Sequence, residues 1–236
     1  NRETLTKLFQ AGVNVTRLNF SHGSHEEHQK KIDLIKEVRE EMGLPIAIML
    51  DTKGPEYRIG TFEQGTVTVE EGDTFTFTTD DMIGDVTRVS VNYKDLIKNL
   101  HVGDRILVNN GLVIFQVTQL QGHDAICRVV TGGVLSDRKS MCFPNKVMTG
   151  PYLSEQDKKD LLFGIQNGVD FIACSFVSCK QDLIDVRNYL AEIGGEGVDL
   201  IAKIENQSGY DHIEEICRCC DGIMVARGDM GVEIPF

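Results

Sequence analysis

The chain has 236 residues, of which 41% are hydrophobic and 25% are charged, so it is long enough to bury one large core or two ordinary ones. No apolar run approaches the roughly 18 to 20 residues that span a bilayer, which argues against a membrane protein. The formal net charge of −12 argues against nucleic acid as the main partner, because phosphate backbones are bound by clustered Lys and Arg; local basic sites for small phosphates remain allowed.

Apolar runs followed by amphipathic helices alternate along much of the chain. Residues 13–20 predict a strand, and the helix after it begins at Ser24, forms a capping box with Glu27 and stops at Gly43. Further strands are predicted at 46–51, 169–176, 200–205 and 222–229. Three more helices are predicted. The first begins at Ser154, with Asp157 at capping-box spacing, has Leu161, Leu162 and Ile165 on its apolar face, and ends at Gly168. The second begins at Ser178, with Gln181 at capping-box spacing, and carries Leu183, Val186 and Leu190; the third covers 213–220. This alternation predicts a parallel sheet with helices outside.

The middle of the chain has a different pattern. Short alternating runs contain Val67 and Val69, Phe75 and Phe77, Ile106 and Val108, and then Val113, Phe115 and Val117 after an Asn110-Gly111 turn. This pattern is typical of an all-β module, a small barrel or sandwich, inserted into the α/β domain. We therefore predict a first α/β part over 1–54, an inserted β domain over 55–150 and a continued α/β part over 151–236.

The cysteines do not predict disulfides or a metal site. Their number, seven, is odd and they are scattered, which favours a reducing cytosol and a cytoplasmic protein. Cys217, Cys219 and Cys220 lack a partner Cys pair or a nearby His that would complete a zinc site. Because Ile213, Ile216, Cys217 and Cys220 recur at helical spacing, we interpret them as a buried helix stripe.

Polar residues occur at the carboxyl ends of the predicted strands. Alternation puts Arg17, Asn19 and Ser21 on one face of their strand, Lys203 and Glu205 on one face of another, and Arg227 and Asp229 on one face of the last, while 46–51 ends in Asp51. One interpretation is that each residue merely caps its strand at the water boundary. Converging buried charges are costly unless they are paired or bind metal, so a shared site at one rim is the better account. Such a rim belongs to an α/β barrel or a doubly wound sheet.

The residue types at this rim indicate phosphoryl transfer. The carboxylates of Glu205 and Asp229 are hard oxygen ligands suited to Mg²⁺ or Mn²⁺. Arg17, Lys203 and Arg58 offer positive charge to phosphate oxygens. Phosphoryl transfer depends mainly on positioning and on neutralising the charge of the moving group, which this set can supply.

At these residues the sequence resembles pyruvate kinase. The motifs that carry the resemblance are VTRLNFSHG (15–23), LDTKGPEYR (50–58), DFIACSF (170–176), AKIEN (202–206) and GIMVARGDMGVEIP (222–235), in the order of that family. The resemblance covers nearly the whole chain and implies a partial TIM (β/α)8 barrel whose inserted β domain is a lid. It also implies a glycolytic enzyme that transfers the phosphoryl group of phosphoenolpyruvate to ADP, giving pyruvate and ATP, and that assembles as a homotetramer.

The resemblance implies a role for each matching residue. Lys203 would neutralise the phosphoryl group in flight, and Arg17 would grip the phosphate of phosphoenolpyruvate. Glu205 and Asp229 would hold Mg²⁺, with the backbone of Gly228 and Asp229 close to the substrate. The remaining positions are the K⁺ ligands Asn19, Ser21, Asp51 and Thr52, and the nucleotide contacts Asn19, His22, Arg58 and Lys139, where Arg138 or Lys146 is an alternative to Lys139. Glu56 places the chain with the K⁺-dependent members.

The chain is too short for the whole fold. Without the inserted module about 140 residues remain, against roughly 250 for an eight-unit barrel, and five of eight strands are found. We expect these residues to belong to a longer polypeptide and, when isolated, to expose sheet edges and the inner barrel face. Three hypotheses follow: an active pyruvate kinase as the parent protein, a truncated non-catalytic segment that at most binds metal or phosphoenolpyruvate, and, as a weaker alternative, another Mg²⁺ barrel enzyme acting on phosphoenolpyruvate or an oxoacid.

Overall fold

The computed structural model describes residues 1–144, 146 and 150–234, and these fall into two compact units. The first, here called the α/β unit, comprises Asn1–Pro55, Tyr152–Ile204 and His212–Val225. The second, here called the β unit, comprises Glu56–Pro151, Glu205–Asp211 and the residues from Ala226 onward. Among the helices of the described residues, none combines the length and the apolar character that crossing a bilayer requires.

A parallel sheet is the centre of the α/β unit. Within the described residues it contains five strands in the order β1 (Val15–Asn19), β2 (Ala47–Asp51), β12 (Phe171–Cys174), β13 (Asp199–Ile204) and β14 (Gly222–Val225). All four neighbouring pairs are parallel. The strands therefore confirm the predicted parallel α/β architecture, and β1 and β14 are the edge strands of the described sheet.

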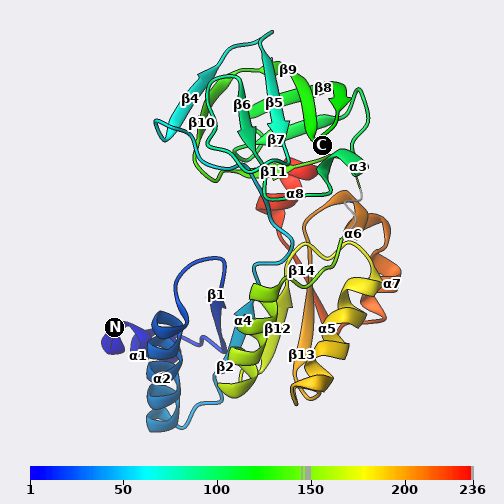
Figure 1. The fold of residues 1–236 in the computed structure, drawn as a ribbon. Coiled ribbons are helices and arrows are strands. Elements are labelled where there is room, and N and C mark those ends of the chain that lie inside the picture. Colours follow the sequence, from blue (N-terminus) through cyan, green and yellow to red (C-terminus); the bar gives the residue numbers. More distant parts are fainter. Residues whose placement is uncertain (145, 147–149, 235–236) are drawn as a thin grey trace. The chain divides into compact units, whose positions relative to one another are not determined.

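The helices of this unit run beside the sheet, as Figure 1 shows for α4 and α5. Their bounds are α1 (Arg2–Gln10), α2 (His25–Met42), α4 (Glu155–Gln166), α5 (Lys180–Glu192) and α7 (Ile213–Cys217). The capping boxes at Ser24 and Ser154 are both present, and Gly43 ends α2 at φ 62°. Helix α1 was not predicted, although Asn1 caps it by accepting a hydrogen bond from the Thr4 amide.

Three helix predictions need correction. Helix α5 begins one residue later than predicted, because the Asp182 carboxylate, and not Gln181, accepts the amides of Ser178 and Cys179. Leu162, assigned to the buried face of α4, is 38% exposed, whereas Leu161 is fully buried. The helix predicted over 213–220 ends at Cys217, and that cysteine is exposed while Ile216 is buried, so the apolar stripe is shorter than its spacing suggested.

The two faces of the parallel sheet are buried to different degrees. On the face toward the helices, the side chains of the three central strands β2, β12 and β13 are at most 1% exposed, including Ile48, Leu50, Ile172, Leu200 and Ile204. On the opposite face Met49, Phe171 and Ile201 are only half-buried. At the edges, Val15 is 41%, Ile223 43% and Val225 54% exposed. These exposures match the expectation that an incomplete barrel leaves its edges and inner face open.

The prediction for the last strand was wrong in two ways. The strand predicted to reach Asp229 ends at Val225, where its pairing with Ile204 of β13 ends, and the backbone continues as helix α8 (Arg227–Glu233). Alternation back from Arg227 and Asp229 puts Ile223 and Val225 on the predicted site face. The register instead pairs Lys203 with Met224, so Ile223 and Val225 lie on the face opposite Lys203. Alternation within one strand cannot decide which face is which, because that depends on register with a neighbour.

The β unit contains, among the described residues, a sheet of seven strands and a separate pair. The seven follow the order β3 (Tyr57–Arg58), β11 (Ser140–Cys142), β7 (Arg105–Val108), β8 (Val113–Gln121), β9 (Asp124–Thr131), β5 (Thr74–Thr78) and β6 (Arg88–Ser90), and the pair is β10 (Gly133–Ser136) with β4 (Thr66–Val69). A bridge between Ile59 and Val91 joins the chain directly after β3 to the chain directly after β6, so the sheet closes on itself as a small barrel.

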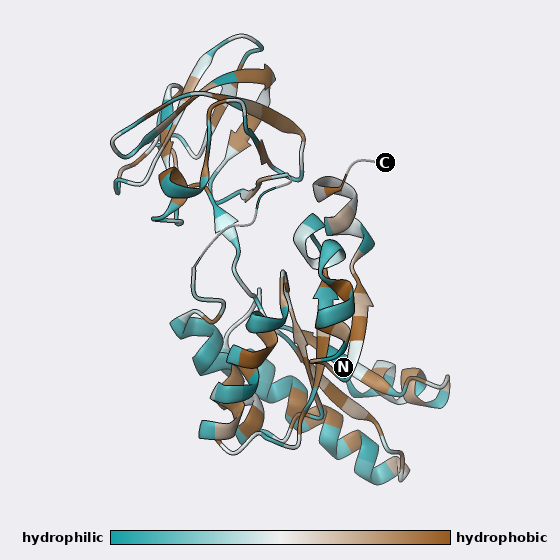
Figure 2. Cartoon of the chain, turned by 90° about the vertical axis from the view of Figure 1, so that its right-hand side faces the viewer, coloured by the Kyte–Doolittle hydropathy of each residue, from teal (hydrophilic) through white to brown (hydrophobic). Residues whose placement is uncertain are grey.

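Apolar side chains fill this barrel. Phe75, Phe77 and Phe115 are fully buried, and their ring centroids lie 4.9 to 5.4 Å apart. The predicted turn between β7 and β8 contains Asn109, Asn110 and Gly111, all at positive φ. Short helices α3 (Leu96–Asn99), α6 (Gln207–Asp211) and α8 also belong to this unit. Figure 2 shows apolar bands along the strands and mixed polar and apolar faces on the helices.

Candidate functional site

Three of the predicted charged residues meet at the carboxyl ends of β1, β2 and β13. The Asp51 carboxylate accepts a hydrogen bond from Arg17 Nε at 2.5 Å, and its Oδ1 lies 3.0 Å from Lys203 Nζ. Asp51 is 1% and Lys203 7% exposed, whereas the Arg17 side chain is 49% exposed. The cluster therefore holds two positive charges and one negative charge, with one cation inside the protein and one at its surface.

Ser175, directly after β12, is a fourth member of this cluster that the sequence analysis missed. Lys203 Nζ donates to Ser175 Oγ at 2.9 Å, and the hydroxyl donates to the Thr52 carbonyl at 2.6 Å. Ser175 is 2% exposed. Sequence could have found it: residues 171, 173 and 175 alternate on the face that carries Asp51 and Ile201, so Ser175 is one more polar residue at the end of an apolar strand.

The predicted K⁺ ligands lie at the ends of β1 and β2. Asn19 and Asp51 are direct neighbours across these strands, and the Asn19 side-chain oxygen accepts the Ser21 amide at 2.9 Å. Thr52 follows Asp51, is 4% exposed, and its hydroxyl oxygen accepts the Ser175 amide at 3.1 Å. These four residues offer carboxylate, amide and hydroxyl oxygens, a donor set that fits a hard cation.

A pocket of about 480 Å³ opens beside this cluster, at the start of α2. Its lining includes Arg17, Asn19 and His22, three predicted ligand contacts, together with His28 and Lys31. His28 is 2% exposed, stacks on Phe20 at 4.0 Å, and its Nε2 lies 2.9 Å from the His22 carbonyl. Burial lowers the pKa of the His28 imidazole. The neutral ring thus supports the turn that carries His22.

The predicted Mg²⁺ ligands belong to the β unit. Glu205 directly follows β13 and is 1% exposed, while Gly228 and Asp229 are exposed in the first turns of α8. Two carboxylates form a donor set that fits Mg²⁺ or Mn²⁺. That Glu205 and Asp229 share a site with Lys203 stays a prediction. Pro235, at the end of the last motif, lies outside the described residues.

The predicted nucleotide contacts in the β unit differ in the hydrogen bonds and ion pairs that they make within the protein. Arg58 on β3 donates from Nε and Nη2 to the Glu56 carboxylate at 3.0 and 2.8 Å, and from Nη1 to the Arg138 carbonyl at 2.7 Å. The Lys139 carbonyl accepts the Ile59 amide. Lys146 lies 2.7 Å from Asp104 in an ion pair of the barrel, which favours Lys139 or Arg138 over Lys146 as a ligand contact.

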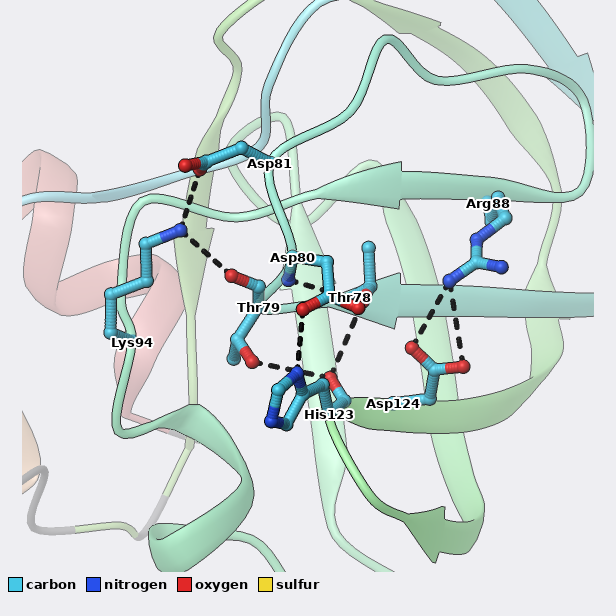
Figure 3. A network of polar contacts seen from close by, with 8 residues as sticks. All are labelled: Thr78, Thr79, Asp80, Asp81, Arg88, Lys94, His123 and Asp124. Carbon is cyan, nitrogen blue, oxygen red and sulfur yellow. Dashed lines mark hydrogen bonds and ion pairs between the residues drawn. The ribbon is translucent and has the colours of Figure 1, made fainter.

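Another polar cluster lies in the β unit, and Figure 3 shows it around the end of β5. His123 Nδ1 is 2.5 Å from Asp80, Lys94 Nζ is 2.6 Å from Asp81, and Arg88 Nη2 is 3.2 Å from Asp124. The side chains of Asp80, Asp81 and His123 are 60 to 94% exposed, and exposed pairs contribute at most about 1 kcal/mol. We interpret these contacts as surface pairs that join neighbouring loops and strands.

In the described part of the chain, neither the Cys174 thiol nor a multi-residue metal centre competes with the strand-end site. Burial raises the pKa of the Cys174 thiol on β12 to about 12, so this cysteine stays protonated and inert. Within the described ranges, no group of three or more His, Cys, Asp and Glu side chains converges as a metal centre would require. The cluster of Arg17, Asp51, Ser175 and Lys203 is therefore the strongest candidate, and its excess of positive charge suits an anionic ligand.

Comparison with known proteins shows the family to which the chain belongs. The family model described as pyruvate kinase, barrel domain, matches residues 1–236. The chain is 44% identical to the pyruvate kinase of Clostridium perfringens over 237 aligned residues. The alignment spans the whole of this chain and half of that relative. The chain is 42% identical to the pyruvate kinase of Geobacillus stearothermophilus, of which it covers 40%. The chain thus spans about half or less of the length of these curated relatives. Because the match extends over the entire chain, the chain belongs to the pyruvate kinase family.

Proposed function

We propose that the complete protein carrying this chain transfers the phosphoryl group of phosphoenolpyruvate to ADP, giving ATP and the enolate of pyruvate, which is then protonated. The observation that carries this proposal is the cluster of Arg17, Asp51 and Lys203 in a chain of this family. With two cations and one carboxylate, the cluster keeps a net positive charge that a phosphate can neutralise.

In this proposal Arg17 and Lys203 act on the phosphate at different stages. Arg17 is half exposed, so its guanidinium is accessible to an incoming phosphoenolpyruvate and binds the phosphate. Lys203 is nearly buried and held by Asp51 and Ser175, so its ammonium is positioned before the substrate arrives. A positioned cation in a water-poor site stabilises the charge of the phosphoryl group during transfer.

The proposal assigns ions to the two oxygen-rich sets. Glu205 and Asp229 would hold Mg²⁺ or Mn²⁺, and Asn19, Ser21, Asp51 and Thr52 would hold K⁺. When bound, these ions supply positive charge to the carboxylate and phosphate of the substrate. Gly228 would approach the substrate with its backbone, and Asn19, His22, Arg58 and Lys139 would contact the nucleotide. The β unit would act as a lid over the site.

The biological setting is proposed from the family. A pyruvate kinase acts in glycolysis in the cytoplasm, and we propose the same setting and a homotetrameric assembly for the complete protein. These assignments depend on the membership of the family and on the match to its barrel domain.

A coupled assay of pyruvate formation tests the activity. The complete gene product and the 236-residue chain are each supplied with phosphoenolpyruvate, ADP and Mg²⁺, with and without K⁺. We expect pyruvate from the complete protein, more with K⁺ than without, and a fall in kcat of about 10²-fold or more in Lys203→Met with phosphoenolpyruvate binding largely kept. A complete protein that forms no pyruvate with all ions present contradicts the proposal.

The alternative of a non-catalytic segment has its own outcome in the same assay. The chain covers only 40 to 50% of these two relatives, so the 236 residues are assayed separately from the complete protein. Binding of phosphoenolpyruvate or Mn²⁺ by the 236-residue chain, with pyruvate formed by the complete protein alone, would assign binding to this part and catalysis to the whole.

A further inference from the structure

Ser175 makes hydrogen bonds to Thr52 and Tyr152 in addition to its contact with Lys203. Its amide donates to Thr52 Oγ1 at 3.1 Å, and its carbonyl accepts from the Tyr152 hydroxyl at 2.6 Å. Its hydroxyl donates to the Thr52 carbonyl at 2.6 Å. The amide, carbonyl and hydroxyl of this residue are thus each fixed by a named partner. The oxygen that accepts the Lys203 ammonium at 2.9 Å therefore has little freedom to move.

The backbone around Ser175 is also constrained. Phe176, the next residue, has φ 56°, a conformation that is rare for a bulky side chain and that persists only where the surroundings enforce it. On the other side, Gly54 has φ 66°, and a Cβ there would lie 2.7 Å from the Ser175 carbonyl oxygen. The segment after β2, which contains Gly54, thus packs against the strained segment after β12, which contains Ser175 and Phe176.

Ser175 contacts both Lys203, the predicted phosphoryl-neutralising residue, and Asp51, a predicted K⁺ ligand. Its hydroxyl oxygen accepts from Lys203 and lies 3.2 Å from Asp51 Oδ1, and Asp51 itself lies 3.0 Å from Lys203 Nζ. Lysine is a flexible chain whose ammonium can point in several directions, so one carboxylate contact does not fix it. Two acceptors, one at the end of β2 and one directly after β12, define a direction, because the ammonium must satisfy both.

We propose that Ser175 is a positioning residue for the phosphoryl transfer, which acts by orienting the ammonium of Lys203. This inference rests on the proposed function, since it assigns a partner to the residue that neutralises the moving group. Ser175 acts through Lys203 and need not touch the substrate. Its hydroxyl lowers the barrier because the ammonium does not have to reorient when charge develops on the phosphoryl oxygens.

The test is a double-mutant cycle in the complete gene product. Ser175→Ala is expected to lower kcat by about 10- to 100-fold, the size expected for loss of one hydrogen bond to a charged group, and to change KM for phosphoenolpyruvate by less than about 3-fold. In the Lys203→Met background the same substitution is expected to cost less than about 2-fold, because the ammonium it orients is absent. Ser175→Thr, which keeps the hydroxyl, is expected to recover part of the rate.

Two further variants keep the test decisive. Tyr152→Phe removes the bond to the Ser175 carbonyl while leaving the serine in place, and it should lower kcat less than Ser175→Ala and lose its effect in the Lys203→Met background. Ser90→Ala is the matched control, since that hydroxyl also donates to a main-chain carbonyl, Met82 at 3.0 Å, but lies in the β unit. It should leave kcat unchanged.

The outcomes separate this inference from the proposed function. A complete protein that forms no pyruvate overturns the proposed function before any serine variant is compared. An active protein in which Ser175→Ala reduces kcat equally with and without Lys203 overturns the positioning role, because a structural defect would act in both backgrounds. An unchanged kcat in Ser175→Ala overturns it as well.

Discussion

Asp51→Asn is expected to destabilise the α/β unit by about 3 kcal/mol, whereas Lys203→Met is expected to change its stability by less than about 1.5 kcal/mol. Both Arg17 and Lys203 contact the Asp51 carboxylate, which is 1% exposed. Loss of its charge leaves a nearly buried ammonium without that counter-charge, and removing one partner of a buried pair costs about 3 to 5 kcal/mol. The lower end applies because Arg17 is 49% exposed and water screens its charge.

Lys203→Met has a smaller effect for a physical reason that the structure supplies. Methionine keeps the apolar stem and nearly the volume of the lysine, and Asp51 retains Arg17 as its partner. Hydrogen exchange of the amides in β2 and β13, followed by mass spectrometry, measures the local free energy of opening for each variant. Asp33→Asn on the exposed side of α2 is the control and should shift this energy by at most about 0.5 kcal/mol. Equal losses for Asp51→Asn and Lys203→Met would refute the reasoning, because they would mean that Arg17 does not compensate the carboxylate.

Three further predictions follow from single sites. Gly54→Ala should lower thermal stability by the equivalent of more than about 1 kcal/mol, since its Cβ would meet the Ser175 carbonyl; Gly43→Ala, at similar φ in open space, should cost less, and equal melting temperatures would contradict the clash. The lowered pKa of His28 means that the folded state resists a proton that the unfolded state accepts near pH 6.5. Stability should therefore be complete above about pH 6.5 and fall as the pH drops below it, and His28→Gln should flatten this slope in unfolding curves between pH 7 and 5. Glu56→Lys should weaken the K⁺ requirement of pyruvate formation by adding positive charge, while Glu56→Gln, which releases the same arginine without adding charge, should keep it; an unchanged requirement in Glu56→Lys would count against the assignment.

Local signals in the sequence predicted most of the α/β unit. The five strands were recognised from short apolar runs, and the helices at Ser24 and Ser154 from reciprocal capping pairs that the structure contains. These signals involve residues three or four positions apart, so no knowledge of tertiary contacts is needed to read them. The exposure of Cys217 could not be predicted in this way. Periodicity shows which residues share a helix face, but not how much of that face a neighbouring element covers.

Long-range pairing limited the prediction of the site. Arg17, Asp51 and Lys203 were correctly expected to meet, because each ends an apolar strand of a parallel sheet. The face of β14 expected to lead to Arg227 and Asp229 was wrong, because only the register with β13 decides which face is beside Lys203. Ser175 satisfies the same alternation, but a neutral hydroxyl does not carry the large burial cost that marks a charged residue as functional. For β14 the missing information was the identity of the residue opposite on the next strand.

Asp51 would link the proposed K⁺ and Lys203 electrostatically, because one carboxylate would serve both. Asp51 is a predicted K⁺ ligand, and the same carboxylate contacts both Lys203 and Arg17 in the structure. A cation bound by Asp51 would place positive charge beside these two side chains and weaken their hold on the carboxylate, because like charges repel at short range. Ser175 then has a second consequence, since its hydroxyl would remain an acceptor for the Lys203 ammonium when the carboxylate is engaged elsewhere. If the ion binds as proposed, a serine between its ligands and the lysine would let one small site hold both cations while the ammonium keeps its direction.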